Sequence, residues 1–244
     1  MSIDQLQASF DTSLDGRFGP LRAALRARPG QRDDGTPALE TLKLAAAADP
    51  GHYGAQMALG QALASAGDRS AFGPLEKAAA LVPVATGEDS PHAVMARLAE
   101  QLGDTARAMS EYQALLAQEH TSVEPARRLA ALAAKAAAIP PLLLAYDRVV
   151  SLDPFDAAAH TGLGRLAFER NDAETAMREF KSVLALAPAD RASAHCDLGE
   201  AYLLAGRGAE AKKEALAALE IAPTFERAQE LLLNAIKPAG PGAP

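Results

Sequence analysis

The chain of 244 residues is poor in aromatic side chains and in cysteine. Trp is absent, aromatic residues make up 5% of the sequence, and Cys196 is the only cysteine. No intrachain disulfide can therefore form, and the hydrophobic core has to be built mainly from Ala, Leu and Val. Dense runs of β-branched and aromatic residues are also missing, so strands are not expected.

Two further absences limit localisation and partners. No stretch approaches the roughly 18 apolar residues that a membrane-spanning helix needs, and the N-terminal MSIDQLQASF lacks the apolar segment of a signal peptide. We therefore expect no membrane insertion and, by default, a soluble cytoplasmic protein. The formal net charge of −7 opposes general nucleic-acid binding, which favours a basic surplus.

Alanine and leucine are abundant, and an internal repeat organises them. Both residues favour helix, because they lose little side-chain entropy there. Residues 157–190 align with residues 192–225, and both segments carry His-x-x-Leu-Gly early, a polar or glycine turn in the middle and Ala-Pro near the end. The offset is 35 residues because Arg191 is inserted between two units of 34. A period of this length indicates stacked helical repeats.

The same frame extends towards the N-terminus. It predicts five repeats, at 53–88, 89–122, 123–156, 157–190 and 192–225, after a degraded helix pair at 19–52. Residues 226–237 predict one more amphipathic helix, which would cover the apolar face of the last repeat. We expect residues 1–18 to be an N-terminal helix or linker remnant, and residues 238–244 to be a disordered tail.

Each unit is expected to be a pair of antiparallel helices. In the last unit, one helical stripe of i, i+3, i+4 and i+7 is formed by His195, Leu198, Gly199 and Tyr202. Gly206 is expected to stop this first helix, and Pro223 to end the second. In the preceding unit Asp172 is placed to cap the second helix. Pro140 and Pro141 are expected in a first helical turn, where proline is tolerated.

This pattern resembles the tetratricopeptide repeat family. The residues that carry the resemblance are Leu163, Gly164, Ala176, Phe180 and Pro188, then Leu198, Gly199, Tyr202, Ala211, Ala218 and Pro223. The Trp position of the family is occupied by Gln56, His92, Ala126, His160 and His195. The resemblance implies an all-α fold, an α-solenoid that winds antiparallel helix pairs into a right-handed superhelix, with a C-terminal capping helix. A fold of this kind says little about function.

Motifs for catalysis, cofactors or metals are weak. His92, His160 and His195 share one repeat position, which suggests either a metal-binding ladder or side chains that fill the pocket of the family's Trp. We favour pocket filling, because no carboxylate or thiol recurs beside these positions. The Gly-x-Gly-x-x-Ala sequence at 162–167 lies inside a predicted helix, where it cannot cradle a phosphate. We therefore expect no enzyme activity, no cofactor and no metal site.

The resemblance also implies a concave groove that holds peptides on the first helix of each pair. Carried over by position, the expected groove residues are Arg97, Glu100, Gln101, Arg127, Lys135, Arg165, Phe168, Glu169, Glu200 and Leu203. Each is open to two interpretations, ligand contact or a solvated face. Cys196 is expected to be a small, unreactive residue of the same groove.

Three arginines of this set are the expected anchors for a partner. Arg97, Arg127 and Arg165 are predicted to line up on consecutive repeats, and a guanidinium group binds a carboxylate through two parallel hydrogen bonds. They would hold an acidic segment of a protein or peptide. The sequence therefore favours a non-catalytic scaffold for protein–protein interaction. It does not indicate an oligomeric state.

A second hypothesis concerns a larger protein. Residues 80–92, 153–167 and 220–233 resemble the C-terminal repeat region of bacterial peptidase-MA-like metalloproteins. That resemblance implies an accessory repeat region that recruits substrate for a zinc peptidase domain outside this chain.

Overall fold

The structure, a computed structural model, describes residues 7–9, 12 and 39–236. The chain divides into two compact units, residues 1–136 and 137–244. The described residues contain helices and short connections but no strand, so the predicted all-α fold class is confirmed. Most of the predicted segments 1–18 and 19–52, and the tail 238–244, lie outside the described residues.

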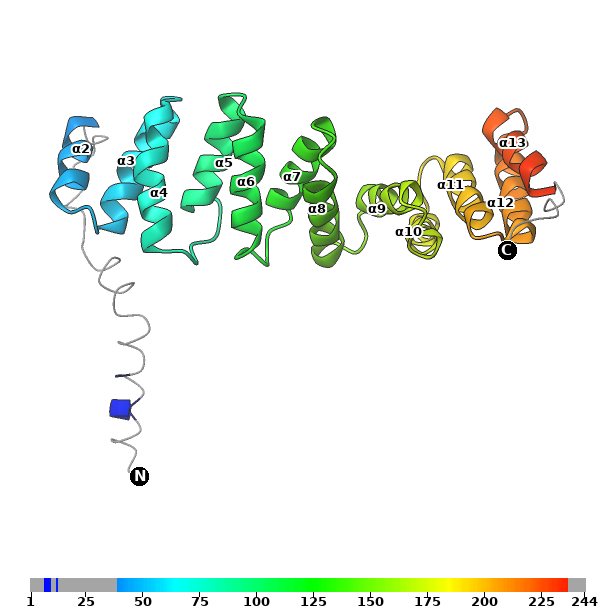
Figure 1. The fold of residues 1–244 in the computed structure, drawn as a ribbon, viewed down its shortest axis with the longest axis horizontal. Coiled ribbons are helices and arrows are strands. Elements are labelled where there is room, and N and C mark those ends of the chain that lie inside the picture. The colour runs from blue at the N-terminus through cyan, green and yellow to red at the C-terminus, as the bar shows by residue number, and fades with distance from the viewer. Residues whose placement is uncertain (1–6, 10–11, 13–38, 237–244) are drawn as a thin grey trace. The chain divides into compact units, whose positions relative to one another are not determined.

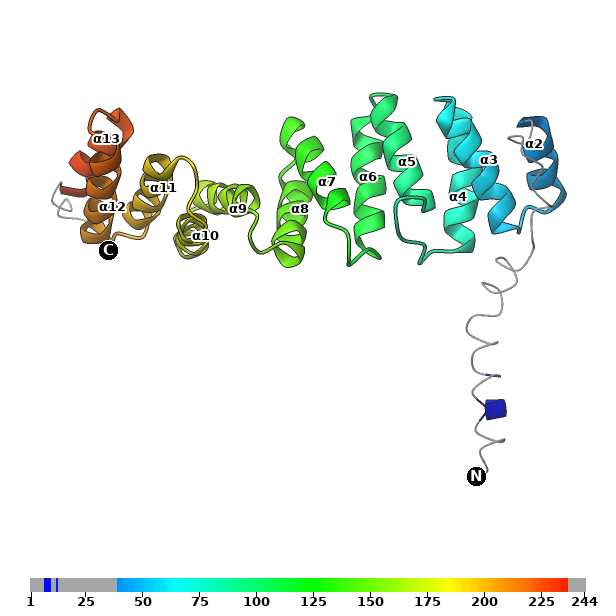
Figure 2. The same cartoon turned by 180° about the vertical axis from the view of Figure 1, so that it is seen from behind.

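The first unit is a row of helices, each packed against the next one in the sequence (Figure 1). The helices are α2 (Leu39–Ala48), α3 (Tyr53–Ser65), the 3₁₀ helix η1 (Arg69–Ala71), α4 (Phe72–Leu81), α5 (Pro91–Gln101), α6 (Thr105–Leu116) and α7 (Glu124–Lys135). Figure 2 shows the same order from behind, with α5, α6 and α7 again side by side. Each helix buries its apolar stripe only by contact with its neighbours, which is how an α-solenoid is built.

The second unit repeats this arrangement. Its helices are α8 (Ile139–Leu152), α9 (Ala157–Glu169), α10 (Ala173–Ala185), α11 (Arg191–Leu204), α12 (Gly208–Ile221) and α13 (Glu226–Ile236). Each packs against the next, and α13 also contacts α11. None of the described helices is both long and apolar enough to cross a bilayer. The boundary between the units falls inside the repeat predicted at 123–156, and the assigned repeat boundaries and the superhelical hand stay predictions.

The turn between the two helices of each predicted repeat has one recurring backbone conformation. The residue at the same position of the five repeats has a positive φ, between 51° and 73°, in Gly67, Gly103, Ala137, Asn171 and Gly206. In four of the turns the next N–H donates to the carbonyl five residues earlier, as from Asp172 to Ala167 at 2.9 Å. This is the Schellman motif that ends many helices. The predicted stop at Gly206 is therefore confirmed.

The predicted helix starts are also confirmed. The Asp172 carboxylate accepts a hydrogen bond of 3.1 Å from the Thr175 N–H at the start of α10. A capping side chain of this kind satisfies one of the free N–H groups of the first turn. In α8 no side chain caps the first turn, and Pro140 and Pro141 occupy it. Proline loses nothing there, because its missing N–H would have no helical partner.

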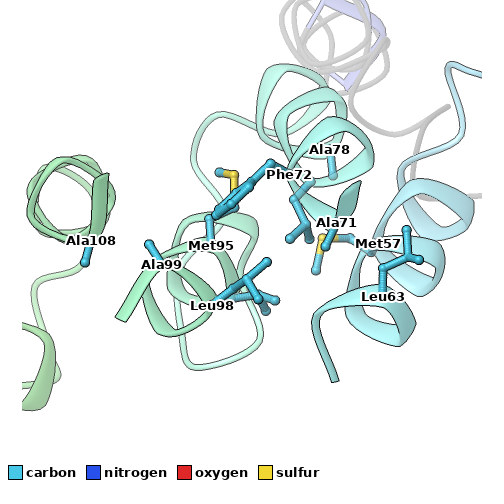
Figure 3. Packing of buried hydrophobic residues seen from close by; sticks show 11 residues of the cluster. Met57, Leu63, Ala71, Phe72, Ala78, Met95, Leu98, Ala99 and Ala108 are labelled. Atoms are coloured by element: carbon cyan, nitrogen blue, oxygen red, sulfur yellow. The ribbon is translucent and has the colours of Figure 1, made fainter. Parts of the chain in front are cut away.

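Small residues let the helices approach closely. Figure 3 shows the core of the first unit, with Met57, Phe72 and Met95 among its buried residues. In this unit a Cβ added to Gly60 would lie 2.5 Å from the Leu75 Cγ. In the second unit a Cβ on Gly164 would lie 2.5 Å from the Phe180 Cε1. Since such distances are far below van der Waals contact, only glycine fits at these helix crossings.

Gly199 has a different partner from Gly164. In the last repeat the position of Phe180 is taken by Ala215, and a Cβ on Gly199 would instead lie 2.5 Å from the Leu231 Cδ2 of α13. Leu231 and Ala228 of α13 are 2% and 0% exposed. The final helix therefore supplies the bulk that the last repeat lacks.

Candidate functional site

A cavity of about 690 Å³ lies between α5, α6 and α7 in the first unit. Its lining residues come from the three helices and from the loops that precede α5 and α7. They are Gly87, Glu88, Asp89, Ala93, Arg97, Glu100, Tyr112, Leu115, Glu119, Thr121, Ser122, Glu124, Pro125 and Arg128. A volume of this size is within the range of ligand pockets.

The buried Glu119 joins the two loops at the rim of the cavity. Its carboxylate accepts hydrogen bonds from Thr121, from Ser122 N–H and, across 32 residues of sequence, from Gly87 N–H at 3.1 Å. The Thr121 hydroxyl and the backbone donors stabilise the charged form and lower the pKa of Glu119 to about 2. The loop before α5 is thereby tied to the loop before α7, which holds the rim in one geometry.

The Glu100 and Glu124 carboxylates of the cavity are held by neighbouring side chains. The Tyr112 hydroxyl donates to the Glu100 carboxylate, and burial together with this bond raises the pKa of Tyr112. Arg128 donates from Nε to Glu124 Oε1 at 3.0 Å and lies 3.9 Å from Glu100 Oε2. The Glu124 and Glu100 carboxylates raise the pKa of Arg128 further. These contacts fix the orientation of Glu100 and Arg128 on facing helices.

Arg97 lines both this cavity and a second one. Its guanidinium donates to the backbone oxygen of Glu88 at 2.6 Å. The second cavity, of about 580 Å³, is lined by Gln61, Ala64, Ser65, Asp89, Val94, Arg97, Leu98 and Gln101. The two cavities share Asp89 and Arg97, so they adjoin along the face formed by α3, α5 and α7. We call this pair of cavities the unit-1 trough.

A third and smaller cavity lies in the second unit. It measures about 220 Å³ and is lined by Arg165, Phe168, Glu169, Phe180, Asp197, Glu200 and Arg227. Arg227 of α13 donates to Asp197 at 2.6 Å and to both carboxylate oxygens of Glu200, at 2.8 and 2.7 Å. Hydrogen bonds to the two carboxylates raise the pKa of Arg227. Because Glu200 is already occupied, it serves to anchor α13 to α11.

Seven of the ten predicted groove residues line these cavities. Arg97 and Glu100 line the larger cavity and Gln101 the adjoining one, whereas Arg165, Phe168, Glu169 and Glu200 line the cavity of the second unit. Arg127 and Lys135 are exposed on α7 and line none of the three. Leu203 is partly buried against the hydrophobic core of the second unit.

Two sequence-based placements need correction. Arg97 and Arg165 each follow the histidine of their repeat by five residues, but Arg127 follows Ala126 directly, and Ala131 occupies the matching position. The three arginines therefore do not share one repeat position. Cys196, predicted in the groove, is 0% exposed and packs among the small residues of α12 and α13. Burial raises the pKa of its thiol to about 11.

The shared histidine position contains a feature that the sequence reading overlooked. In His92, His160 and His195 the ring Nδ1 lies 2.7 Å from a glutamate Oε2, and the glutamate is always 19 residues later. The partners are Glu111, Glu179 and Glu214. The statement that no carboxylate recurs beside the histidines was therefore wrong: the carboxylate is on the second helix of the same pair. Each ring meets one carboxylate, and the described residues contain no cluster of three metal-binding side chains.

Glu119, Tyr112 and Arg128 were also missing from the predicted site. The sequence Glu-x-Thr-Ser at 119–122 favours local bonds between a carboxylate and nearby N–H groups. The hydrogen bond from the Gly87 N–H to Glu119 joins two loops that are 32 residues apart in the sequence. The pattern of neighbouring residues therefore could not predict it. Arg128 lies one residue after Arg127, which was predicted for the groove. An error of one residue along the helix therefore selected the arginine that does not line the cavity.

Sequence comparison supports the repeat frame at its C-terminal end. Residues 192–225 match the family described as tetratricopeptide repeat. Residues 192–225 are therefore a tetratricopeptide repeat. The matched range coincides with the last of the five repeats predicted from the sequence.

Solved structures similar to this chain include YrrB, described as a TPR protein with an unusual peptide-binding site. The two chains are 17% identical, the match covers 79% of this chain and 98% of that one, and the TM-score is 0.49. Another is MamA, from residue 41 to its end, from Desulfovibrio magneticus RS-1, with 20% identity, coverage of 58% and 79%, and a TM-score of 0.47. No curated protein matches the chain. Identities this low do not indicate a shared ligand.

Proposed function

We propose that this protein is a non-catalytic scaffold that binds an extended segment of a partner protein in the unit-1 trough. The observation that carries the proposal is the cavity between α5, α6 and α7, whose rim is held by the bonds of Glu119. A preorganised rim lowers the entropy lost on binding, which favours affinity. Helical repeats present such surfaces because each added pair extends a continuous face.

The acidic partner expected from the sequence fits the unit-1 trough poorly. Arg97 already donates to the Glu88 carbonyl, and Arg128 lies between Glu124 and Glu100. An acidic segment would compete with these acceptors. Arg165 in the second unit is 63% exposed and 3.9 Å from Asp197, so it is the arginine on which an acidic contact could still be built.

The test of the proposed function is selection of random 12-residue peptides, displayed on phage, against the immobilised full-length chain. The selected peptides are then synthesised and measured by isothermal titration calorimetry. Ser122→Trp places an indole at the rim of the cavity and should weaken binding at least tenfold. Ser151→Trp, on an exposed position of α8, is the matched control and should bind like the wild type. Failure to select any peptide, or equal binding by both variants, would refute the proposal.

A further inference from the structure

The charge of the unit-1 trough is strongly one-sided. The larger cavity is lined by five carboxylates and two guanidinium groups, a net charge of −3 from its ionisable side chains at neutral pH. The carboxylates belong to Glu88, Asp89, Glu100, Glu119 and Glu124. A concave surface of one sign concentrates its field and attracts the opposite charge.

Two of these carboxylates are unengaged. The side chains of Glu88 and Asp89 are exposed, and neither makes a hydrogen bond or ion pair within the described part of the chain. The other three are held: Glu100 by Tyr112, Glu124 by Arg128, and Glu119 by the loop donors. A cation entering the cavity would therefore find two free acceptors beside a fixed acidic wall.

The adjoining cavity has a different chemistry. Gln61 and Gln101 line it, and their side-chain amides make no hydrogen bond to the described residues. An amide offers both a donor and an acceptor, which matches the backbone of an extended peptide. The trough thus combines a site for a positive side chain with a neighbouring polar site for main chain.

We propose that the unit-1 trough binds an extended segment with a lysine or arginine side chain in the cavity lined by Glu88 and Asp89. This inference rests on the proposed function, and it replaces the acidic segment with a basic one. Both arginines of the cavity already meet oxygen acceptors, whereas the Glu88 and Asp89 carboxylates meet no positive group among the described residues. Charge complementarity of this kind selects partners and speeds association more than it adds affinity.

The peptide selection described above also tests the inference. In the selected peptides Lys and Arg should outnumber Asp and Glu. Glu88→Gln and Asp89→Asn should each weaken binding of the synthetic peptide about two- to fivefold, the effect of an exposed ion pair. The loss should shrink in 500 mM salt, because exposed charges are screened. The Glu88→Lys, Asp89→Lys double variant should weaken binding at least tenfold.

The matched control separates the trough from the overall negative charge. Glu220→Gln with Glu230→Gln removes two exposed carboxylates from the second unit, and binding should stay within twofold of the wild type. Acidic or neutral selected peptides, or an equal loss in the control, would overturn the basic partner. If Ser122→Trp still weakened the binding of those peptides, the proposed function would stand. Insensitivity to Ser122→Trp would overturn both.

Discussion

The buried pair of His160 and Glu179 gives a sharp test of how the repeats are held together. The two side chains are 9% and 8% exposed, and Nδ1 lies 2.7 Å from Oε2. The other ring nitrogen, Nε2, lies 3.1 Å from the backbone oxygen of Pro154. A carboxylate and a carbonyl oxygen both accept, so each ring nitrogen faces an acceptor. The pair links α9 to α10 and to the preceding loop.

Replacing His160 by Ala leaves the Glu179 carboxylate buried with a weaker set of partners. A buried group that loses its hydrogen-bond partner costs about 1–3 kcal/mol, and more when it is charged, because it stays desolvated without compensation. Arg178 still contacts Glu179 Oε1 at 2.9 Å, although its side chain is 66% exposed. We therefore expect a loss of about 3 kcal/mol. His195→Ala removes a pair that is 16% and 20% exposed, and it should cost about 1 kcal/mol.

The assay is urea unfolding followed by circular dichroism, combined with hydrogen exchange at the amides of α9 and α10. The second measurement is needed because a chain of two units is not expected to unfold as one two-state system. The double variant His160→Ala with Glu179→Ala should recover part of the loss, because no carboxylate is then left buried without its partner. The reasoning is refuted if His160→Ala costs no more than His195→Ala, or if the double variant loses the sum of both single effects.

Three further predictions concern the turns, the helix crossing and the rim. Gly164→Ala should destabilise the protein by about 1–3 kcal/mol in thermal unfolding, since its Cβ would overlap the Phe180 ring; unchanged stability would contradict the packing. Ala137→Gly should stabilise by roughly 0.5–1 kcal/mol, because Ala pays for a φ of 51° and Gly does not; a loss would contradict this. Glu119 has a pKa lowered to about 2 by Thr121 and the backbone donors, so its contribution is complete above about pH 4.5 and lost as pH falls towards 2. Glu119→Gln should lower stability at pH 7, with a gap to the wild type that closes through this window; a gap independent of pH would refute the assignment.

The helix ends could be predicted because they depend on short-range chemistry. The positions of Gly206, Asp172 and Pro140 mark helix ends through φ, capping and the missing N–H, and each of these acts within one turn of backbone. The small residues Gly164 and Gly199 indicate close helix crossings for the same reason: their effect does not depend on the neighbour's identity. The structure then differs only in which side chain fills the space, Phe180 in one repeat and Leu231 in the next.

The candidate site could be predicted only in part. Position in the repeat singled out Arg97 and Glu100, which line a cavity, but it could not show that Arg97 is bonded to the Glu88 carbonyl. Whether a charged side chain is free or engaged depends on atoms from other helices. For the same reason Cys196 was placed in the groove, although α12 and α13 bury it completely.

The sequence by itself determined that this chain is a series of helix pairs, where those helices turn, and which residue types recur at each repeat position. These follow from periodicity and from backbone preferences that act over a few residues. Only the tertiary structure decided that Glu179 faces His160, that Glu119 joins two distant loops, and that the unit-1 trough is acidic. Those contacts depend on which face of its helix a side chain occupies and on how neighbouring helix pairs pack. A shift of one residue along a helix is enough to turn a charged side chain from solvent to a partner on the next helix.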